Sequence, residues 1–126
     1  MQKIIHVDNS AFFRKVMKIF ISEQGYAIEG FSRGSEALEQ LHSGDVCLLI
    51  TGLSLADMKG EELIQKIITS PCSSVPIITL TSTESDTQLQ KLRLLGVKAT
   101  ILKSEPWREQ LLPYLQEYVL YQRENL

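Results

Sequence analysis

The stretch Val46-Cys47-Leu48-Leu49-Ile50-Thr51-Gly52 is an almost uninterrupted apolar run that ends in a glycine. Apolar residues at both odd and even positions are typical of a parallel strand that is covered on both faces. Helical patterns alternate with this run and with four similar ones. The alternation predicts an α/β fold built on a parallel sheet with right-handed crossovers. The other expected strands are 3–7, 27–31, 76–80 and 99–102.

The expected helices before the last one are 10–24, 35–42, 61–69 and 84–95. Ser10 and Thr83 are suitable N-caps for the first and the fourth of them, because a side-chain oxygen can accept a hydrogen bond from a free amide of the first turn. Gly25 and Gly96 follow the same two helices and favour their termination.

The last helix is interrupted by a proline. We expect an irregular turn over 106–110 and then a helix that has Pro113 in its first turn, where the missing amide proton costs nothing. The expected core residues of this helix share one helical face. They are Tyr114, Leu115, Tyr118 and Val119.

Length and composition indicate a single globular domain. The chain has 126 residues, 44% of them hydrophobic and 22% charged, which are ordinary values for such a domain. A net charge of −2 gives no basic face for nucleic acid, and no apolar run is long enough to span a membrane. We expect one cytoplasmic domain over 1–126 with reduced cysteines, and 121–126 is a candidate linker or tag remnant.

Polar residues follow the expected strands where those strands end. In an open α/β sheet, functional sites concentrate beyond the carboxyl ends of the strands. A carboxylate, an amide, a hydroxyl and an ammonium group from separate strands would meet there. The residues in question are Asp8, Asn9, Gly52, Thr81 and Lys103.

Four segments resemble the receiver domain of two-component response regulators, such as the chemotaxis regulators. They are Ile4-Ile5-His6-Val7-Asp8-Asn9-Ser10, 48–60 with Met58 and Gly60, 76–82, and 96–103. The resemblance covers nearly the whole chain. It implies a flavodoxin-like, doubly wound sheet of five parallel strands in the order 2-1-3-4-5, with five helices. It also implies phosphorelay signal transduction, with a histidine kinase, a phosphotransfer protein or an output domain as partner.

Two departures from the family pattern affect its chemistry directly. Gly52 stands where the family has the aspartate that accepts phosphate, and Asn9 replaces one of the two acids that bind metal. Asp8 is then the remaining carboxylate and faces Lys103, so their charges sum to zero. We predict a direct or water-bridged Asp8–Lys103 pair and Mg²⁺ binding at Asp8 that is weak at most, since Mg²⁺ sites rely on carboxylates.

Further departures affect the readout. Thr100 stands where an aromatic residue usually reports the phosphorylation state, and Ala56 and Ser104 replace two prolines of the family pattern. The bond before Ser104 is expected to be trans, because a cis bond before a non-proline residue costs about 2.5–4 kcal/mol.

These losses favour a degenerate receiver, or pseudo-receiver, that acts as a phosphorylation-independent protein-interaction module. We expect no enzymatic activity and no cofactor. An alternative is a phosphoryl-accepting receiver whose acceptor was replaced at Gly52 by engineering or shifted to another residue, with Asp57 and Ser54 as the candidates. A flavin or nucleotide binder is disfavoured, because the first turn has no glycine-rich phosphate cradle.

An interaction module needs a contact surface, and the helical pattern suggests two. Phe12 and Ile19 should lie outside the core stripe of the first helix, the helix that in the family contacts kinases or phosphotransfer proteins. The fourth helix, fifth strand and fifth helix form the face that in the family mediates dimers or output contacts, so a homodimer is a second expected assembly. The candidates on that face are Leu94, Trp107 and Tyr121.

Overall fold

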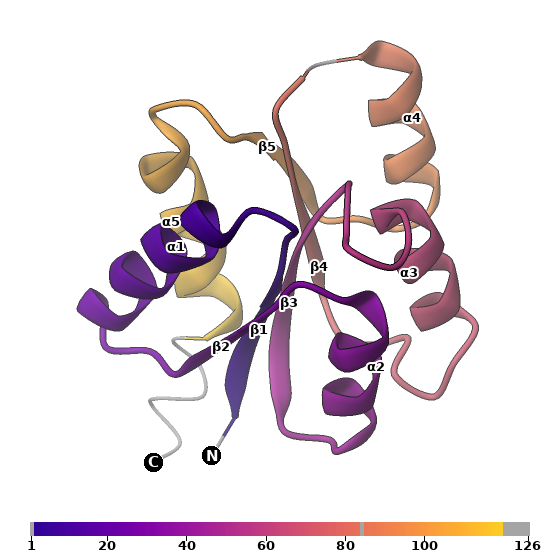
Figure 1. Cartoon of the computed structure of the whole chain (residues 1–126), viewed down its shortest axis with the longest axis horizontal. Coiled ribbons are helices and arrows are strands. Elements are labelled where there is room, and N and C mark those ends of the chain that lie inside the picture. The colour runs from indigo at the N-terminus through magenta and orange to yellow at the C-terminus, as the bar shows by residue number, and fades with distance from the viewer. Residues whose placement is uncertain (1, 84, 120–126) are drawn as a thin grey trace.

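The computed structural model describes residues 2–83 and 85–119 as a three-layer α/β structure (Figure 1). Five parallel strands form one sheet in the order β2-β1-β3-β4-β5, as the sequence predicted. The elements are β1 Lys3–Val7, α1 Ala11–Glu23, β2 Ile28–Phe31, α2 Gly34–His42, β3 Val46–Gly52, α3 Gly60–Ile68, β4 Ile77–Thr81, α4 Asp86–Leu94, β5 Ala99–Leu102 and α5 Trp107–Tyr118.

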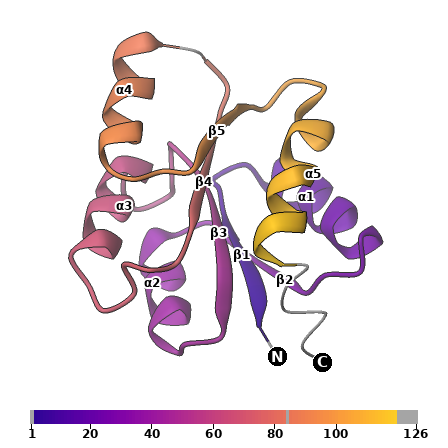
Figure 2. The same ribbon diagram turned by 180° about the vertical axis from the view of Figure 1, so that it is seen from behind.

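Two hydrophobic cores lie on opposite faces of the sheet. Helices α1 and α5 cover one face, and α2, α3 and α4 cover the other (Figures 1 and 2). Successive side chains of β1 alternate between these faces, so that Ile4 belongs to the first core and Ile5 and Val7 belong to the second. Every residue of β3 is buried, which explains its continuous apolar sequence.

The loop between β3 and α3 brings two glycines into backbone contact. A Cβ on Gly60 would lie 2.3 Å from the carbonyl oxygen of Gly52 and 2.8 Å from the Cα of Leu53. The Gly60 amide donates to the Leu53 carbonyl at 3.0 Å. A residue without a side chain is needed for this approach. The loop therefore returns to the end of β3 and fixes the position of Gly52.

The start of α4 differs from the prediction. The helix begins at Asp86, and the N-cap is Ser85, whose hydroxyl accepts a hydrogen bond from the Gln88 amide at 3.4 Å. Thr83 instead closes a turn with the hydroxyl of Thr81 and does not cap the helix. Two hydroxyl residues so close together left the cap ambiguous in the sequence.

The prediction for α5 was also wrong at its start. The helix already begins at Trp107, so Pro113 lies inside it and not in its first turn. Trp107, Leu111 and Leu115 pack one helical face into the core, and this packing outweighs the hydrogen bond that Pro113 cannot donate. Tyr114 and Tyr118, which were expected in the core, are only partly buried.

Tyr121 and the tail 121–126 lie outside the described residues. Among the helices that are described, none has the length and apolar character that crossing a membrane requires.

The contact between Gly60 and Gly52 predicts that Gly60→Ala destabilises the domain. The added methyl group would press on backbone atoms that cannot move aside, and overpacking of this kind costs about 1–3 kcal/mol or more. Urea unfolding followed by circular dichroism measures the loss. Gly30→Ala is the matched control, because its Cβ would meet no atom closer than 3.7 Å. Equal stabilities of the two variants would contradict the close approach.

Candidate functional site

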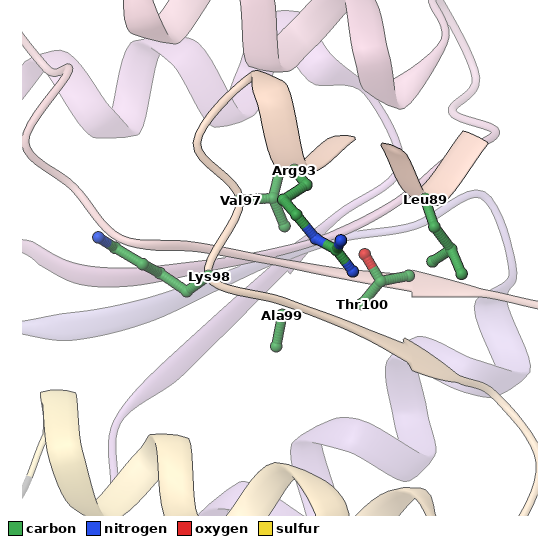
Figure 3. Close-up of a pocket in the computed structure, with 6 residues that line it drawn as sticks. All are labelled: Leu89, Arg93, Val97, Lys98, Ala99 and Thr100. Atoms are coloured by element: carbon green, nitrogen blue, oxygen red, sulfur yellow. The ribbon is translucent and has the colours of Figure 1, made fainter. Parts of the chain in front are cut away.

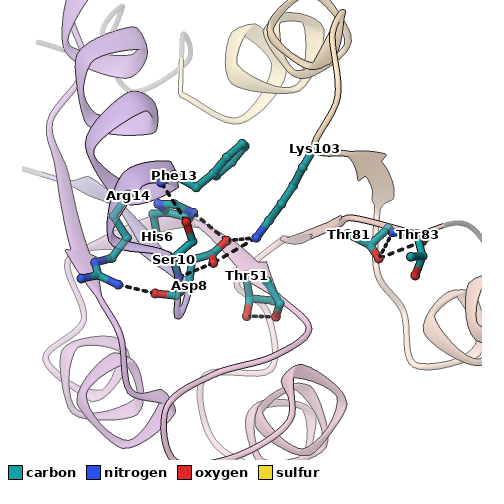
Figure 4. Close-up of polar contacts among 10 residues, drawn as sticks. His6, Asp8, Ser10, Phe13, Arg14, Thr51, Thr81, Thr83 and Lys103 are labelled. Carbon is teal, nitrogen blue, oxygen red and sulfur yellow. Dashed lines mark hydrogen bonds and ion pairs between the residues drawn. The ribbon is translucent and has the colours of Figure 1, made fainter.

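Asp8 is the centre of a polar site at the carboxyl ends of the strands (Figure 4). Its side chain is 2% exposed. Lys103 Nζ, which follows β5, lies 2.8 Å from Asp8 Oδ2 and 3.0 Å from Oδ1. The predicted ion pair is therefore present and direct. It joins two strands that are separated in the sheet by β3 and β4.

The turn after β1 also holds Asp8 in place. The Ser10 amide donates to Asp8 Oδ1 at 2.9 Å, and the Ser10 hydroxyl accepts from the Phe13 amide as the N-cap of α1. The Arg14 guanidinium donates to the Asp8 carbonyl oxygen at 2.7 Å. The first turn of α1 thus fixes the carboxylate that Lys103 meets.

Opposing effects determine the ionisation of Asp8. Burial disfavours the charged form and would raise the pKa of Asp8. The nearby His6 imidazole, the Lys103 ammonium group and the Ser10 amide outweigh burial and hold the pKa below its usual value. Asp8 is therefore a carboxylate at neutral pH, paired with a lysine.

His6 is a site residue that sequence reasoning missed. It is 1% exposed, and its Nε2 lies 3.7 Å from Asp8 Oδ2, too far for a hydrogen bond. Burial lowers the pKa of His6, and the neighbouring Asp8 only partly offsets this, so the imidazole is neutral at neutral pH. The available signal was periodicity: His6 lies in β1 and Asp8 directly follows it, two residues further on, so that both side chains lie on the same face.

Gly52 lies directly against Asp8. A Cβ on Gly52 would be 2.9 Å from Asp8 Oδ2, so Asp8 occupies part of the space that a side chain at this position would need. The preceding Thr51 is buried, and its hydroxyl donates to the Gly52 carbonyl oxygen at 2.8 Å. The end of β3 therefore presents backbone, and no carboxylate, to the site.

Asp57, which was considered as a substitute acceptor, caps another helix. Its Oδ1 accepts from the Gly34 amide at 2.7 Å and its Oδ2 from the Ser35 amide at 3.1 Å, at the N-terminus of α2. Slight burial acts against ionisation, but these hydrogen bonds outweigh it and lower the pKa of Asp57. Its carboxylate is engaged away from Lys103, and Ser54 is exposed in the same loop.

The remaining strand-end residues do not join the ion pair. Asn9 is exposed, and the buried Thr81 hydroxyl donates to the Thr83 carbonyl oxygen at 2.8 Å (Figure 4). The Thr100 hydroxyl lies 2.7 Å from that of Thr79 on the neighbouring strand. The Lys103–Ser104 bond is trans, as expected. Among the described residues, the cis peptide bond lies two bonds further on, at Glu105–Pro106.

The resemblance to receiver domains implies a magnesium ion at this site, and the residues present do not fit one. Mg²⁺ requires near-octahedral oxygen ligands, usually with one or two carboxylates. Asp8 is the single carboxylate here, and both of its oxygens lie within 3.0 Å of the Lys103 ammonium group. Within the described residues, no three His, Cys, Asp or Glu side chains gather as metal ligands.

Three of the surface candidates are exposed. The exposed fractions are 76% for Phe12, 52% for Ile19 and 84% for Leu94. Trp107 is a correction, because it is only 3% exposed and cannot contribute to a surface. Its ring packs against Phe13 and Phe20, with centroid distances of 5.1 and 5.5 Å. A tryptophan on this first turn of α5 reaches inward to α1.

Comparisons with known proteins agree with this geometry. Residues 4–115 match the family model of the response regulator receiver domain. The chain is 31% identical to chemotaxis protein CheY1 of Helicobacter pylori over 121 residues, which is 94% of this chain and 96% of that protein.

Solved structures show the same fold. A CheY-like receiver domain protein from Methanospirillum hungatei superposes with a TM-score of 0.84 over 100% of this chain and 99% of its own, at 22% identity, which shows the fold alone. Chemotaxis protein CheY4 of Vibrio cholerae has a TM-score of 0.83 and 25% identity over 94% of this chain and 99% of its own.

The ion pair predicts that Lys103→Met destabilises the domain at neutral pH, because it leaves the Asp8 carboxylate buried without its cation. A buried group that loses its partner costs about 1–3 kcal/mol. The pKa of Asp8 is lower in the folded than in the unfolded protein, where it is about 4. The charged carboxylate therefore stabilises the fold at pH values above about 4. This stabilisation is lost as the pH falls through the pKa of Asp8 in the folded protein. The difference in free energy of unfolding between wild type and variant should therefore become smaller in acid.

Urea unfolding at pH 7 and at pH 3 measures this difference. Lys18→Met is the matched control, because Lys18 is an exposed lysine on α1 and its loss removes the same charge. A gap that stays constant between the two pH values would show that Lys103 does not act through Asp8.

Proposed function

Because this chain belongs to the response regulator receiver domain family, we propose that it is a receiver that works in two-component signalling without aspartyl phosphorylation. In this role it is a cytoplasmic interaction module with no enzymatic activity. Its partners are signalling proteins such as a histidine kinase, a phosphotransfer protein or an output domain.

The observation that carries the proposal is the Asp8–Lys103 pair beside Gly52. Aspartyl phosphorylation requires a carboxylate nucleophile and a cation that offsets the negative charge around it. Gly52 supplies no nucleophile, and the lysine that would neutralise a transferred phosphoryl group is 2.8 Å from Asp8. Because the charges of Asp8 and Lys103 cancel, the site has no surplus negative charge to attract Mg²⁺. Mg²⁺ binding is therefore expected to be weak.

The proposal places function on the surface of the domain. Phe12 and Ile19 on α1 and Leu94 on α4 are exposed apolar side chains, and they are the candidate contact residues. A homodimer through the α4 face is a second assembly consistent with Leu94. Single exposed apolar side chains are also ordinary on protein surfaces, so the chemistry of the site supports the proposal more strongly than they do.

A second candidate function is a phosphoryl-accepting receiver whose acceptor was replaced at Gly52 or moved to another residue. The retained Asp8, Thr81 and Lys103 favour it, since these are site positions of the family. Asp57, in the loop after β3, is the candidate for a moved acceptor. Its carboxylate already accepts hydrogen bonds at the N-terminus of α2, which disfavours that role.

Incubation with phosphoramidate and Mg²⁺, followed by intact-mass spectrometry, tests the proposal. The wild-type chain should acquire no acid-labile phosphate. Gly52→Asp should be phosphorylated slowly and below stoichiometry, because the Cβ of the new aspartate would lie 2.9 Å from Asp8 Oδ2 and Asn9 still lacks a metal-binding charge.

Two outcomes would overturn the proposal. Stoichiometric, hydroxylamine-sensitive phosphate on the wild-type chain would show that an acceptor exists, and Asp57→Asn would show whether it is Asp57. Rapid and complete phosphorylation of Gly52→Asp would favour an otherwise intact switch from which one residue was removed.

A further inference from the structure

A hollow of about 280 Å³ lies between α4 and β5, apart from the ion-pair site (Figure 3). Its lining comes from α4, from the turn that follows and from the start of β5. The lining residues are Leu89, Arg93, Val97, Lys98, Ala99 and Thr100. None of them lines the pocket of about 220 Å³ that contains Lys103 and Thr81. The hollow is therefore a separate place in which a small molecule could bind.

Arg93 supplies a cation to this hollow. Figure 3 shows its guanidinium group pointing toward the Thr100 hydroxyl. Its side chain has no hydrogen-bond or ion-pair partner among the described residues. A guanidinium group carries five N–H donors in a planar fork, which matches the oxygens of a phosphate or carboxylate group. These donors are therefore free to bind an anion.

Thr100 adds a hydroxyl group that can donate a hydrogen bond into the hollow. Its Oγ1 lies 2.7 Å from Thr79 Oγ1 on β4, and either oxygen can be the donor of this bond. Thr79 is fully buried, so its hydroxyl stays beside Thr100 and fixes the position of the Thr100 oxygen. When Thr79 donates, the Thr100 hydrogen is left for an acceptor in the hollow, because a hydroxyl can accept one bond while it donates another.

The charge of the lining also favours an anion. Arg93 and Lys98 both line the hollow, and none of its lining residues carries a carboxylate. The Lys98 side chain extends away from the hollow (Figure 3), so Arg93 is the direct contact and Lys98 adds attraction at longer range. Lys103 differs, because Asp8 already neutralises its ammonium group at 2.8 Å. The hollow thus has a positive charge that no side chain of its lining offsets.

The size and the walls of the hollow limit the ligand. Sites for drug-sized molecules have volumes of roughly 300–1,000 Å³, so a hollow of about 280 Å³ suits a smaller molecule. Leu89 and Val97 give it apolar walls on which a short carbon skeleton can pack. An anionic group joined to a few carbon atoms fits both features.

We propose that this hollow binds a small phosphate monoester without reacting with it. Arg93 and the Thr100 hydroxyl hold the phosphate group, and Leu89 and Val97 contact the carbon skeleton. A phosphate monoester carries nearly two negative charges at neutral pH, which matches the two cations of the lining better than a carboxylate does. The inference goes beyond the proposed interaction module and does not depend on it, because binding here leaves the chain chemically unchanged.

Glycerol 3-phosphate is the probe, titrated into the ¹⁵N-labelled domain at a constant ionic strength of about 0.15 M. Amide NMR should show saturable shifts at Arg93 and at 97–100, with a Kd of about 1–5 mM. Arg93→Gln should weaken binding roughly tenfold, as expected for loss of a charge-assisted contact, and Thr100→Val about threefold for loss of a neutral hydrogen bond. Arg33→Gln is the matched control, because it removes the same charge at an exposed position before α2 and should leave the Kd unchanged.

Two further titrations identify the group that is bound. Glycerol should cause no shift, since it has the same carbon skeleton and no phosphate, and acetate should bind at least about fivefold more weakly because of its single charge. Acetate binding as tight as that of the ester would overturn the assignment to phosphate. The absence of saturation in the millimolar range, shifts centred on Lys103 and Thr81, or equal weakening by Arg33→Gln and Arg93→Gln would each overturn the site itself.

Discussion

The ion pair between Asp8 and Lys103 is the interaction on which the site depends. It joins the ends of β1 and β5 across the width of the sheet, with Nζ 2.8 Å from Oδ2. Around it lie the N-cap of α1, which fixes the carboxylate through Ser10, and Phe13, whose ring centroid is 5.0 Å from Lys103 Nζ. Without a carboxylate at Gly52, the lysine has a single anionic partner. The pair thus holds a carboxylate and an ammonium group in direct contact at the carboxyl ends of the strands.

The close approach of Gly60 to Gly52 links the site to the fold. The same loop that returns to the end of β3 carries Asp57 to the N-terminus of α2. The backbone around Gly52 is therefore organised by packing and by the capping of α2. The receiver fold depends on its two hydrophobic cores and does not require a carboxylate at Gly52.

Much of this could be read from the sequence, and two of the three main exceptions depend on tertiary contacts. Apolar runs gave the strands, and the resemblance implied their order. Counting charges at the strand ends predicted that Asp8 would pair with Lys103. Sequence reasoning missed that Asp57 caps α2, that Trp107 packs from α5 against α1, and that His6 lies beside Asp8. The first two depend on contacts between elements far apart in the chain, which local patterns do not encode, whereas the shared face of His6 and Asp8 could have been predicted from strand periodicity.

Mg²⁺ binding at Asp8 is expected to be weak, because the Lys103 ammonium group already contacts both carboxylate oxygens. The most direct measurement is a Mg²⁺ titration of the wild-type domain, followed by NMR of the Lys103 ammonium group and the Asp8 amide. The ion pair predicts that neither signal shows a saturable shift through the millimolar range. A saturable shift of both signals at millimolar or lower Mg²⁺ would contradict it, because the metal would then have displaced the lysine.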